Sequence, residues 1–379
     1  MNPQEQFCHN RDCWAYGRQG EGHIVIHSQK EKRCRCKRCG WTFSVTKGTT
    51  FYRIHKPREL VLTVLTLLGH GCPLQAIVAA FGLDERTVAR WQREAGAQCE
   101  RVHEHLVEAG QVELRQVQAD ELHVRVVVGG VLWLAGALEV KSRLWLGGVV
   151  SARRDRYLIR ALLERVRTCG SVAGVLLCTD GLASYPKEAL KLFREAIRTG
   201  KAGRPRLVLP EGVMVGQVIK RYAKRRVKEV VRRVVRGTEA LVQARVEQTQ
   251  RRAEAVINTA YIERLNATFR GCLAVLGRRT RAGVHNLGTL EAGMWLVGCC
   301  YNFCWTHRSL RQERTTTDDS PGGGGVVDGW IEHTPAQAAG LTDRCWSMHE
   351  LLSFAVPPAE IPKRRGRRPK WLVEAARAA

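Results

Sequence analysis

The stretch of sequence that decides the fold runs Val175-Leu176-Leu177-Cys178-Thr179-Asp180. A short, mostly apolar run bounded by a glycine predicts a strand buried in a sheet. Side chains at the carboxyl ends of core strands project into the crevice where open α/β sheets bind ligands. Asp180 is therefore a candidate functional residue, although an aspartate in a turn or at a helix N-cap would fit the same position.

Strands are expected before this run and helices around it. Residues 112–150 contain β-branched runs broken by Gly129-Gly130 and by Lys141-Ser142-Arg143, which predicts strands. Residues 199–257 are expected to form a basic insertion, with part strand and part helix over 218–237. Helices are expected at residues 57–98, 154–167, 186–198, 258–276 and 287–304. These elements together predict an α/β fold.

A second carboxylate lies in one of the expected strands. Side chains alternate along a strand, so Asp120 shares a face with the apolar Leu122 and Val124. A carboxylate on an apolar face is costly unless a cation or hydrogen bonds compensate. Asp120 is therefore a candidate metal ligand, with a solvated strand-end carboxylate as the alternative. Glu121 falls on the more polar side and is interpreted as an ordinary neighbour.

A third carboxylate lies on an expected helix. Glu263, Asn266 and Arg270 form a polar stripe. The apolar stripe beside it consists of Ile262, Leu265, Phe269, Leu273 and Leu276. A glutamate at the edge of a packed face can reach a site between helix and sheet, and a solvated helix glutamate is the alternative for Glu263.

Asp120, Asp180 and Glu263 together predict a site for two divalent metal ions. Mg²⁺ or Mn²⁺ prefers carboxylate oxygen and keeps water or substrate phosphate as its other ligands. Two such ions stabilise the attacking and leaving oxygens of an in-line phosphoryl displacement. Water would attack first, and the freed 3′-hydroxyl would then attack a target strand.

The charge of the chain indicates a polyanionic partner. Its net charge is +25, which favours double-stranded DNA, with a merely soluble basic protein as the alternative. The longest apolar stretch, at 126–138, is about thirteen residues interrupted by glycines, which is too short to span a bilayer. The polar N-terminus has no apolar signal core, so we expect no membrane partner and a cytoplasmic, nucleoid-associated protein.

Five cysteines within the first 39 residues predict a structural zinc ribbon over residues 1–50. The expected ligands are the cysteines of a C-x4-C and a C-x2-C pair, Cys8, Cys13, Cys36 and Cys39. Cys34 is surplus or an alternative ligand, and His9 or His23 could replace a sulfur. Unrelated thiols are the competing interpretation. A ribbon this small has almost no core, so zinc would supply its folding energy.

Residues 55–100 are typical of a helix-turn-helix domain, with an ordinary helical hairpin as the alternative. The first helix carries an expected apolar stripe, Ile77, Ala80 and Phe81. Gly82 provides the turn, and Asp84 is a suitable N-cap for the second helix.

In the second helix of this domain, Val88 and Trp91 are expected to face inward. Arg86, Arg90 and Arg93 then face outward, where a recognition helix enters the major groove.

Two further basic segments fit contact with DNA. Residues 218–237 are rich in Lys and Arg among valines, which suits a surface that follows phosphates, with a solvated face as the alternative. Residues 313–330 are expected to form a flexible linker before a C-terminal tail at 331–379. The tail contains an AT-hook-like segment that suits a narrow minor groove, Arg365, Gly366, Arg367 and Arg368. A generic basic tail is the alternative.

Several of these stretches resemble one family. Residues 261–270 and 276–280 closely resemble the third catalytic block of insertion-sequence DDE transposases, of the small bacterial class typified by the first-described insertion sequence. Residues 119–122 resemble the first block and 179–181 the second. The N-terminal ribbon, the helix-turn-helix after it, the block at 301–307 and the motif at 334–341 are similar to that family in the same order.

The resemblance covers most of residues 1–357 and implies a DNA transposase. The implied catalytic domain is an RNase H-like mixed sheet with flanking helices at 112–312, with Asp120, Asp180 and Glu263 as metal ligands. Arg270, Arg278 and Arg279 join the expected DNA contacts. The chain departs from the family pattern at Cys34 and at the glycines of 322–325, and His307 receives no role.

Two other functions fit part of the pattern. A domesticated or decayed element would act as a DNA-binding regulator without catalysis. Such a regulator has no physical need for three carboxylates, so the complete set favours the transposase. A structure-selective nuclease would cut DNA without joining it. A transposase would bind double-stranded DNA, both the terminal repeats of its element and the target. Because it must join two DNA ends, we expect a homo-oligomer on that DNA.

Overall fold

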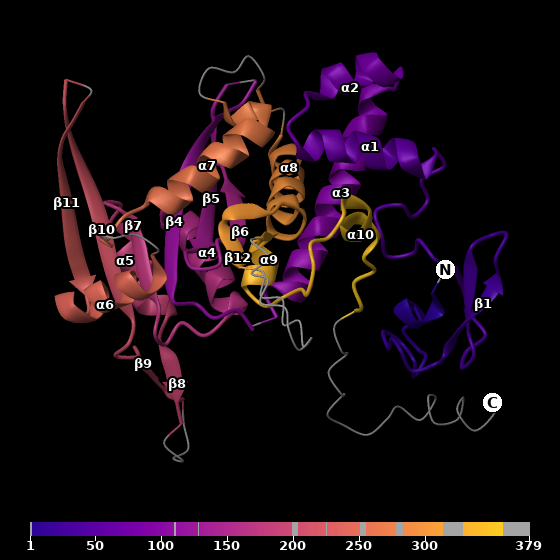
Figure 1. Cartoon of the computed structure of the whole chain (residues 1–379), viewed down its shortest axis with the longest axis horizontal. Coiled ribbons are helices and arrows are strands. Elements are labelled where there is room, and N and C mark those ends of the chain that lie inside the picture. Colours follow the sequence, from indigo (N-terminus) through magenta and orange to yellow (C-terminus); the bar gives the residue numbers. More distant parts are fainter. Residues whose placement is uncertain are drawn as a thin grey trace, which may run out of the picture. The chain divides into compact units, whose positions relative to one another are not determined.

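The computed structural model describes residues 2–109, 111–127, 129–198, 204–224, 226–250, 255–277, 283–284, 286–313 and 329–358. These residues form two compact units (Figure 1). One unit contains the described residues of Met1–Gly48 and of Ala355–Ala379, and the other contains those of Thr49–Phe354.

The N-terminal unit is a small three-stranded antiparallel sheet. Its strands are β1 (Ile24–Ser28), β2 (Arg33–Cys36) and β3 (Thr42–Ser44), in the order β1-β2-β3, and a 3-10 turn, η1 (Pro3–Glu5), precedes them. Phe43 and Ile24 pack with buried cysteines to form the core. This core buries few apolar side chains.

Three helices open the larger unit: α1 (Arg58–Gly69), α2 (Leu74–Phe81) and α3 (Glu85–Leu106). Gly82 adopts φ +60°, the left-handed conformation that glycine tolerates best, and ends α2. The side chain of Asp84 accepts a hydrogen bond from the backbone of Thr87, which confirms the expected N-cap.

The expected apolar stripe on α2 is wrong in part. Ile77 is buried, but Ala80 and Phe81 are exposed, because α2 turns only one face toward its neighbours. Val88 and Trp91 of α3 are fully buried, as expected. Helix α3 continues to Leu106, past the expected end at residue 98, because its later turns pack against α8 (Leu287–Cys299).

The larger unit is of the mixed α/β type and is built on a six-stranded mixed sheet. The strands are β4 (Gln116–Arg125), β5 (Val131–Glu139), β6 (Trp145–Ser151), β7 (Leu176–Asp180), β10 (Met214–Ala223) and β11 (Arg226–Arg236). Their order is β11-β10-β7-β4-β5-β6. Strands β4, β7 and β10 run parallel at the centre, while β5, β6 and β11 pair antiparallel with their neighbours.

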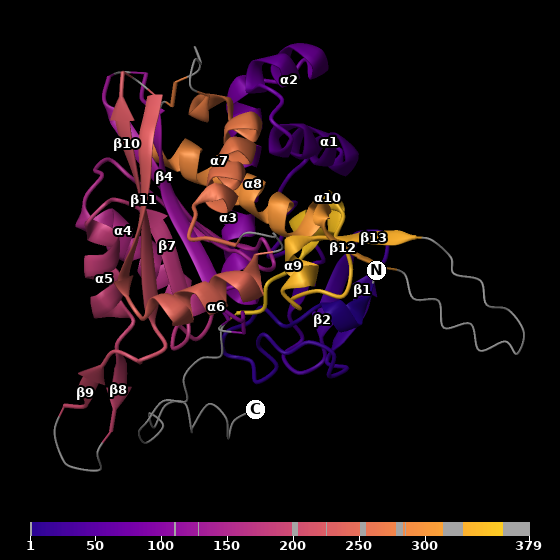
Figure 2. The ribbon, with the colours of Figure 1, turned by 60° about the vertical axis from the view of Figure 1, so that its left-hand side comes forward.

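Helices cover both faces of this sheet. The helices after α3 are α4 (Arg156–Cys169), α5 (Ser184–Leu192), α6 (Glu239–Thr249), α7 (Ala260–Cys272) and α8. Figure 2 shows α4 and α5 on one face of the sheet and α7, α8 and α3 on the other. Helix α5 ends before the expected residue 198, because the short strand β8 (Glu195–Ile197) follows and pairs with β9 (Arg206–Val208).

Smaller elements complete the unit. A 3-10 turn, η2 (Ala274–Leu276), follows α7, and a π-helical turn, η3 (Cys300–Cys304), follows α8. Strands β12 (His307–Glu313) and β13 (Trp330–His333) form a hairpin, and α9 (Pro335–Ala338) and α10 (Met348–Ser353) follow.

Residues 199–257, expected as a basic insertion, contribute two strands of the main sheet. The described residues of the β10–β11 hairpin are strand apart from the turn at Lys224, and none of them is helical. Most of the expected linker and the whole AT-hook-like segment lie outside the described residues.

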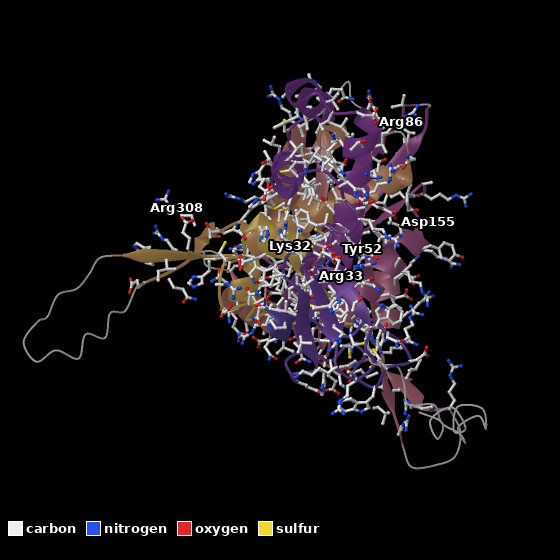
Figure 3. The ribbon with its side chains drawn as sticks, turned by 90° about the vertical axis from the view of Figure 1, so that its right-hand side faces the viewer. Lys32, Arg33, Tyr52, Arg86, Asp155 and Arg308 are labelled. Carbon is white, nitrogen blue, oxygen red and sulfur yellow. The ribbon has the colours of Figure 1, made fainter. Side chains whose placement is uncertain are left out.

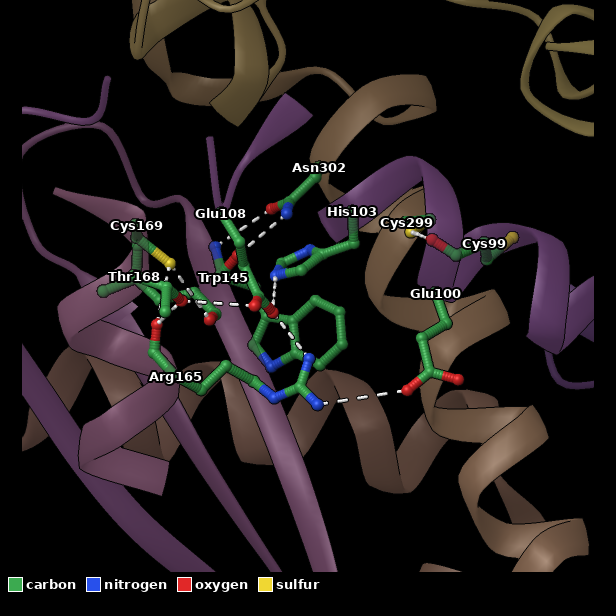
Figure 4. Close-up of polar contacts among 11 residues, drawn as sticks. Cys99, Glu100, His103, Glu108, Trp145, Arg165, Thr168, Cys169, Cys299 and Asn302 are labelled. Carbon is green, nitrogen blue, oxygen red and sulfur yellow. Dashed lines mark hydrogen bonds and ion pairs between the residues drawn. The ribbon is translucent and has the colours of Figure 1, made fainter. Parts of the chain in front are cut away.

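A polar network lies inside the packing of α3 against the sheet (Figure 4). The ring of His103 is fully buried between Trp145 and Trp295, at centroid distances of 5.0 and 5.2 Å. Arg165 lies 2.5 Å from Glu108 and ties α4 to the end of α3. Among the described helices, none is both long and apolar enough to cross a membrane.

Candidate metal sites and an acidic cavity

Four cysteines of the N-terminal unit converge on one point. The sulfurs of Cys8, Cys13, Cys36 and Cys39 all lie within 4.8 Å of one another. The sulfurs of Cys8 and Cys39 are 3.6 Å apart, and those of Cys13 and Cys36 are 3.9 Å apart. Tetrahedral zinc with Zn–S bonds of about 2.3 Å sets sulfurs roughly 3.8 Å apart. The four cysteines could therefore hold one zinc ion.

The backbone around these cysteines supports thiolate ligands. The amide of Asn10 lies 3.5 Å from the sulfur of Cys8, and the amide of Ala15 lies 3.4 Å from that of Cys13. Donors of this kind stabilise negative charge on sulfur. Gly40 adopts φ +71°, and its amide donates to the carbonyl of Cys36, which forms the tight turn after the second pair.

The alternative zinc ligands lie outside this cluster. Cys34 is fully buried and packs in the apolar core of the ribbon. His9 packs between the rings of Phe7 and Phe43, and His23 bonds to Glu21 at 2.9 Å.

Two of the three expected carboxylates lie side by side in the main sheet. Ala119 of β4 pairs with Thr179 of β7 in parallel register, so the next residues, Asp120 and Asp180, are neighbours at the carboxyl end of β7. Oxygens of Asp120, Glu121 and Asp180 lie within 4.8 Å of one another. Oxygen donors at this spacing suit a hard divalent cation.

Glu263 faces the same place from α7. Asp120, Asp180 and Glu263 all line one cavity of about 440 Å³, the acidic cavity, together with Arg154 and Lys220. The ammonium group of Lys220 on β10 lies 2.6 Å from Glu263. The structure thus places all three expected residues in one cavity, each contributed by a different element.

Two buried amides fix the geometry of this cavity. The side-chain oxygen of Gln118 accepts hydrogen bonds from the amides of Tyr261 and Ile262, both at 3.0 Å, which anchors the start of α7 to β4. One turn after Glu263, the amide of Asn266 donates to Asp120 at 2.8 Å. Helix α7 is therefore bonded to β4 on both sides of its glutamate.

The cavity perturbs its own carboxylates. Burial, reinforced by the charges of Glu121, Asp180 and Glu263, raises the pKa of Asp120 to about 6. Burial also acts to raise the pKa of Glu263, but hydrogen bonds from Lys220 and Thr259 outweigh it and lower that pKa. Carboxylates gathered this closely repel one another unless a cation compensates.

The interpretation of Glu121 as an ordinary neighbour is wrong. Its side chain is fully buried and lies 2.8 Å from the guanidinium of Arg154, which also reaches Asp180 at 3.4 Å. Burial raises the pKa of Glu121, and Arg154 opposes that shift. The alternation of side chains between the two faces of a strand did not identify Glu121, because β4 is a central strand and both of its faces are covered at this point.

Sequence reasoning also missed Arg154, Lys220 and Gln118. Arg154 lies in the loop between β6 and α4, and Lys220 was counted only among the basic residues of its segment. The one available signal for Gln118 was its polarity within a buried strand, two residues before Asp120.

The structure describes some of the expected DNA contacts and leaves others outside the described residues. Arg86, Arg90 and Arg93 are exposed along α3, and Figure 3 shows Arg86 near the start of this helix. Arg270 on α7 is partly buried. The remaining expected contacts lie outside the described residues: Arg278, Arg279, Arg365, Gly366, Arg367 and Arg368.

No protein-family profile matches the chain, and no curated protein sequence matches it. The chemistry of the two sites therefore has to be argued from their own residues.

Proposed function

We propose that the protein is a DNA transposase, which cleaves DNA strands and transfers them by two-metal-ion phosphoryl transfer on an RNase H-like fold. The single observation that carries the proposal is the convergence of Asp120, Asp180 and Glu263 on one cavity. The mixed sheet with helices on both faces, the cysteine cluster and the net charge of +25 support the same function.

The residues of the acidic cavity fit divalent metal ions. Asp120 and Asp180 would hold Mg²⁺ or Mn²⁺ at the end of β7, and Glu263 would complete the site from α7. When bound, such ions neutralise the charge that develops on phosphoryl oxygens. Glu121, paired with Arg154, positions this arginine beside Asp180.

The cations of the cavity suit a phosphate backbone. Lys220 and Arg154 line the cavity beside the carboxylates, so they can contact the phosphates that flank the reacting one. Asn266 holds the carboxylate of Asp120 in place, and Gln118 holds the start of the helix that carries Glu263. Asn266 and Gln118 therefore act by positioning the carboxylates.

Binding of double-stranded DNA is proposed for two exposed basic surfaces. The first is the outer side of α3, with Arg86, Arg90 and Arg93. The second is the β10–β11 hairpin, whose outer residues include Arg221 and Lys228. A homo-oligomer on DNA follows from the need to join two ends. A single protein copy per paired-end complex in light scattering would contradict this part of the proposal.

The test is a cleavage and strand-transfer assay with the full chain. Its DNA substrate contains the terminal repeats of the element that carries the gene. Wild type is compared with Asp180→Asn and Glu263→Gln, with and without Mg²⁺. Each variant should lose activity by roughly a hundred-fold or more, as when a central electrostatic group is removed from an active site. Glu164→Gln is the matched control, because Glu164 is exposed on α4, where it pairs with Arg160.

The other outcomes distinguish the alternatives. Binding without cutting by the wild type would favour a DNA-binding regulator. Cutting without joining would favour a nuclease. Activity retained by both carboxylate variants would refute the acidic cavity as the active site.

A further inference from the structure

A second cavity lies along a neighbouring face of α7. It has a volume of about 650 Å³, within the range of small-ligand pockets. Ala260, Arg264 and Thr268 line it at a spacing of four residues, whereas Glu263 faces the acidic cavity. One helix thus carries parts of two cavities of opposite charge.

Arginines and rings dominate the wall of this second cavity. Its described lining contains no carboxylate. It contains four arginines, Arg143, Arg264, Arg308 and Arg311. Its rings are those of Tyr261, Tyr301, His307 and Trp330. Figure 3 shows Arg308 extending from the β12–β13 hairpin. A wall of this composition attracts an anion that also has a flat face.

Arg143 is held in place before any ligand binds. Its backbone adopts φ +62°, which is uncommon for a residue with a side chain. Its guanidinium donates to the carbonyl of Val140 at 2.6 Å and lies 3.9 Å from the ring centroid of Tyr261. Strained residues held by their surroundings cluster at functional sites.

His307 supplies an unused polar group in this wall. Its Nε2 atom is buried and has no hydrogen-bond partner, while its ring lies against Tyr301 at 4.7 Å. Burial, with the charges of Arg143 and Arg264, lowers the pKa of His307 to about 4. The ring is therefore neutral at physiological pH and can bond to a ligand through Nε2. His307 does not line the acidic cavity.

We propose that this cavity binds a nucleotide of a single nucleic-acid strand, with its phosphate against Arg264 and Arg308 and its base stacked on Trp330. The ring of Trp330 is half exposed, so it offers a flat base a stacking surface, and the guanidinium of Arg311, 4.3 Å from the ring centroid, adds a cation beside it. An acidic peptide would use the arginines but not the rings. A duplex is too wide for a concave cavity, whereas a nucleotide taken out of a duplex fits.

The shared helix connects this site to the proposed chemistry. A strand whose reacting phosphate lies at Glu263 can cross α7 and place a neighbouring nucleotide in the second cavity. The identity of that strand rests on the proposed transposase function. The binding itself does not, because it requires no metal ion.

The first test measures binding of a fluorescein-labelled single-stranded oligonucleotide to the full chain in EDTA, by anisotropy over a range of salt. Arg308→Ala should weaken binding several-fold and reduce the slope of log affinity against log salt by about 0.7, one phosphate contact. Trp330→Ala should weaken binding roughly ten-fold with the slope unchanged. Arg160→Ala is the control, because Arg160 is an exposed arginine on α4. Affinities for both variants equal to that of Arg160→Ala would overturn the proposal.

A second measurement locates the strand without relying on variants. An oligonucleotide with 5-iodouracil is cross-linked by light to the wild type, and the modified peptides are mapped. Modification at Trp330 or Tyr261 supports the site, and modification confined to other peptides overturns it. Displacement by poly-glutamate as effective as by unlabelled oligonucleotide would also overturn it. Loss of cleavage in Asp180→Asn and loss of binding in EDTA in Trp330→Ala are separate results, because the binding requires no metal ion.

Discussion

The amide of Asn266 lies 2.8 Å from the carboxylate of Asp120, and this hydrogen bond joins α7 to β4 beside the acidic cavity. Asn266 is almost fully buried, so water cannot replace it. Groups that orient a metal-binding carboxylate typically affect metal affinity or activity 10- to 100-fold. We therefore treat Asn266 as a positioning residue.

Replacing Asn266 by Ala should raise the Mg²⁺ concentration needed for half-maximal strand cleavage by roughly ten-fold. The cause is loss of the side-chain amide that orients Asp120, while the proposed ligands remain. The measurement is a Mg²⁺ titration of the cleavage rate. Asn266→Ser, which keeps a donor, should recover part of the loss. An unchanged Mg²⁺ dependence in Asn266→Ala would show that the contact has no role in the site.

Replacing Gln118 by Leu should lower the free energy of unfolding by about 2–4 kcal/mol, because it leaves the amides of Tyr261 and Ile262 without their acceptor in a buried place. Urea denaturation measures this loss. Gln75→Leu on the exposed surface of α2 is the control and should change stability little. A Gln118→Leu protein as stable as this control would mean that α7 is held by packing alone.

Local chemistry allowed several elements to be predicted from the sequence. Asp84 was recognisable as an N-cap because it precedes a helical pattern, and Asp180 because it ends an apolar run. The cysteine pairs were recognisable by their spacing, and the structure brings four cysteines together as expected. In each case the signal lies within a few residues, where sequence spacing and spatial distance agree.

Contacts between distant segments could not be predicted in the same way. Glu121 was misjudged because alternation assumes that one face of a strand is solvated, and the centre of β4 is covered on both faces. The approach of Lys220 to Glu263 depends on β10 lying beside β7, which the sequence of β10 does not state. The second cavity combines residues from 138 to 330, so no local pattern indicates it.

The zinc ligand set can be tested by comparing two neighbouring cysteines. Cys36→Ser removes a sulfur of the four-cysteine cluster and should lower the zinc content of the purified full chain well below one per protein. Cys34→Ala changes a buried core residue outside that cluster and should keep one zinc. Metal content by atomic spectrometry decides between them. Zinc loss in Cys34→Ala with retention in Cys36→Ser would reverse the assignment.

The last prediction concerns pH and the buried His103. Burial, with the charge of Arg165, lowers the pKa of His103 from 6.5 to about 3. Between these values the unfolded chain binds a proton that the folded chain does not. The contribution of His103 to stability is therefore complete above pH 6.5 and declines as the pH falls toward 3.

For one such group the decline is at most about 1.4 kcal/mol per pH unit, or roughly 2 kcal/mol between pH 7.5 and pH 5. His103→Phe keeps a ring between Trp145 and Trp295 and removes the titrating group. Urea denaturation at both pH values should therefore show a smaller loss of stability on acidification in His103→Phe than in the wild type, by that amount. His55→Gln, at an exposed position, should match the wild type. An equal loss in all three proteins would mean that His103 is protonated inside the folded network, beside Glu108.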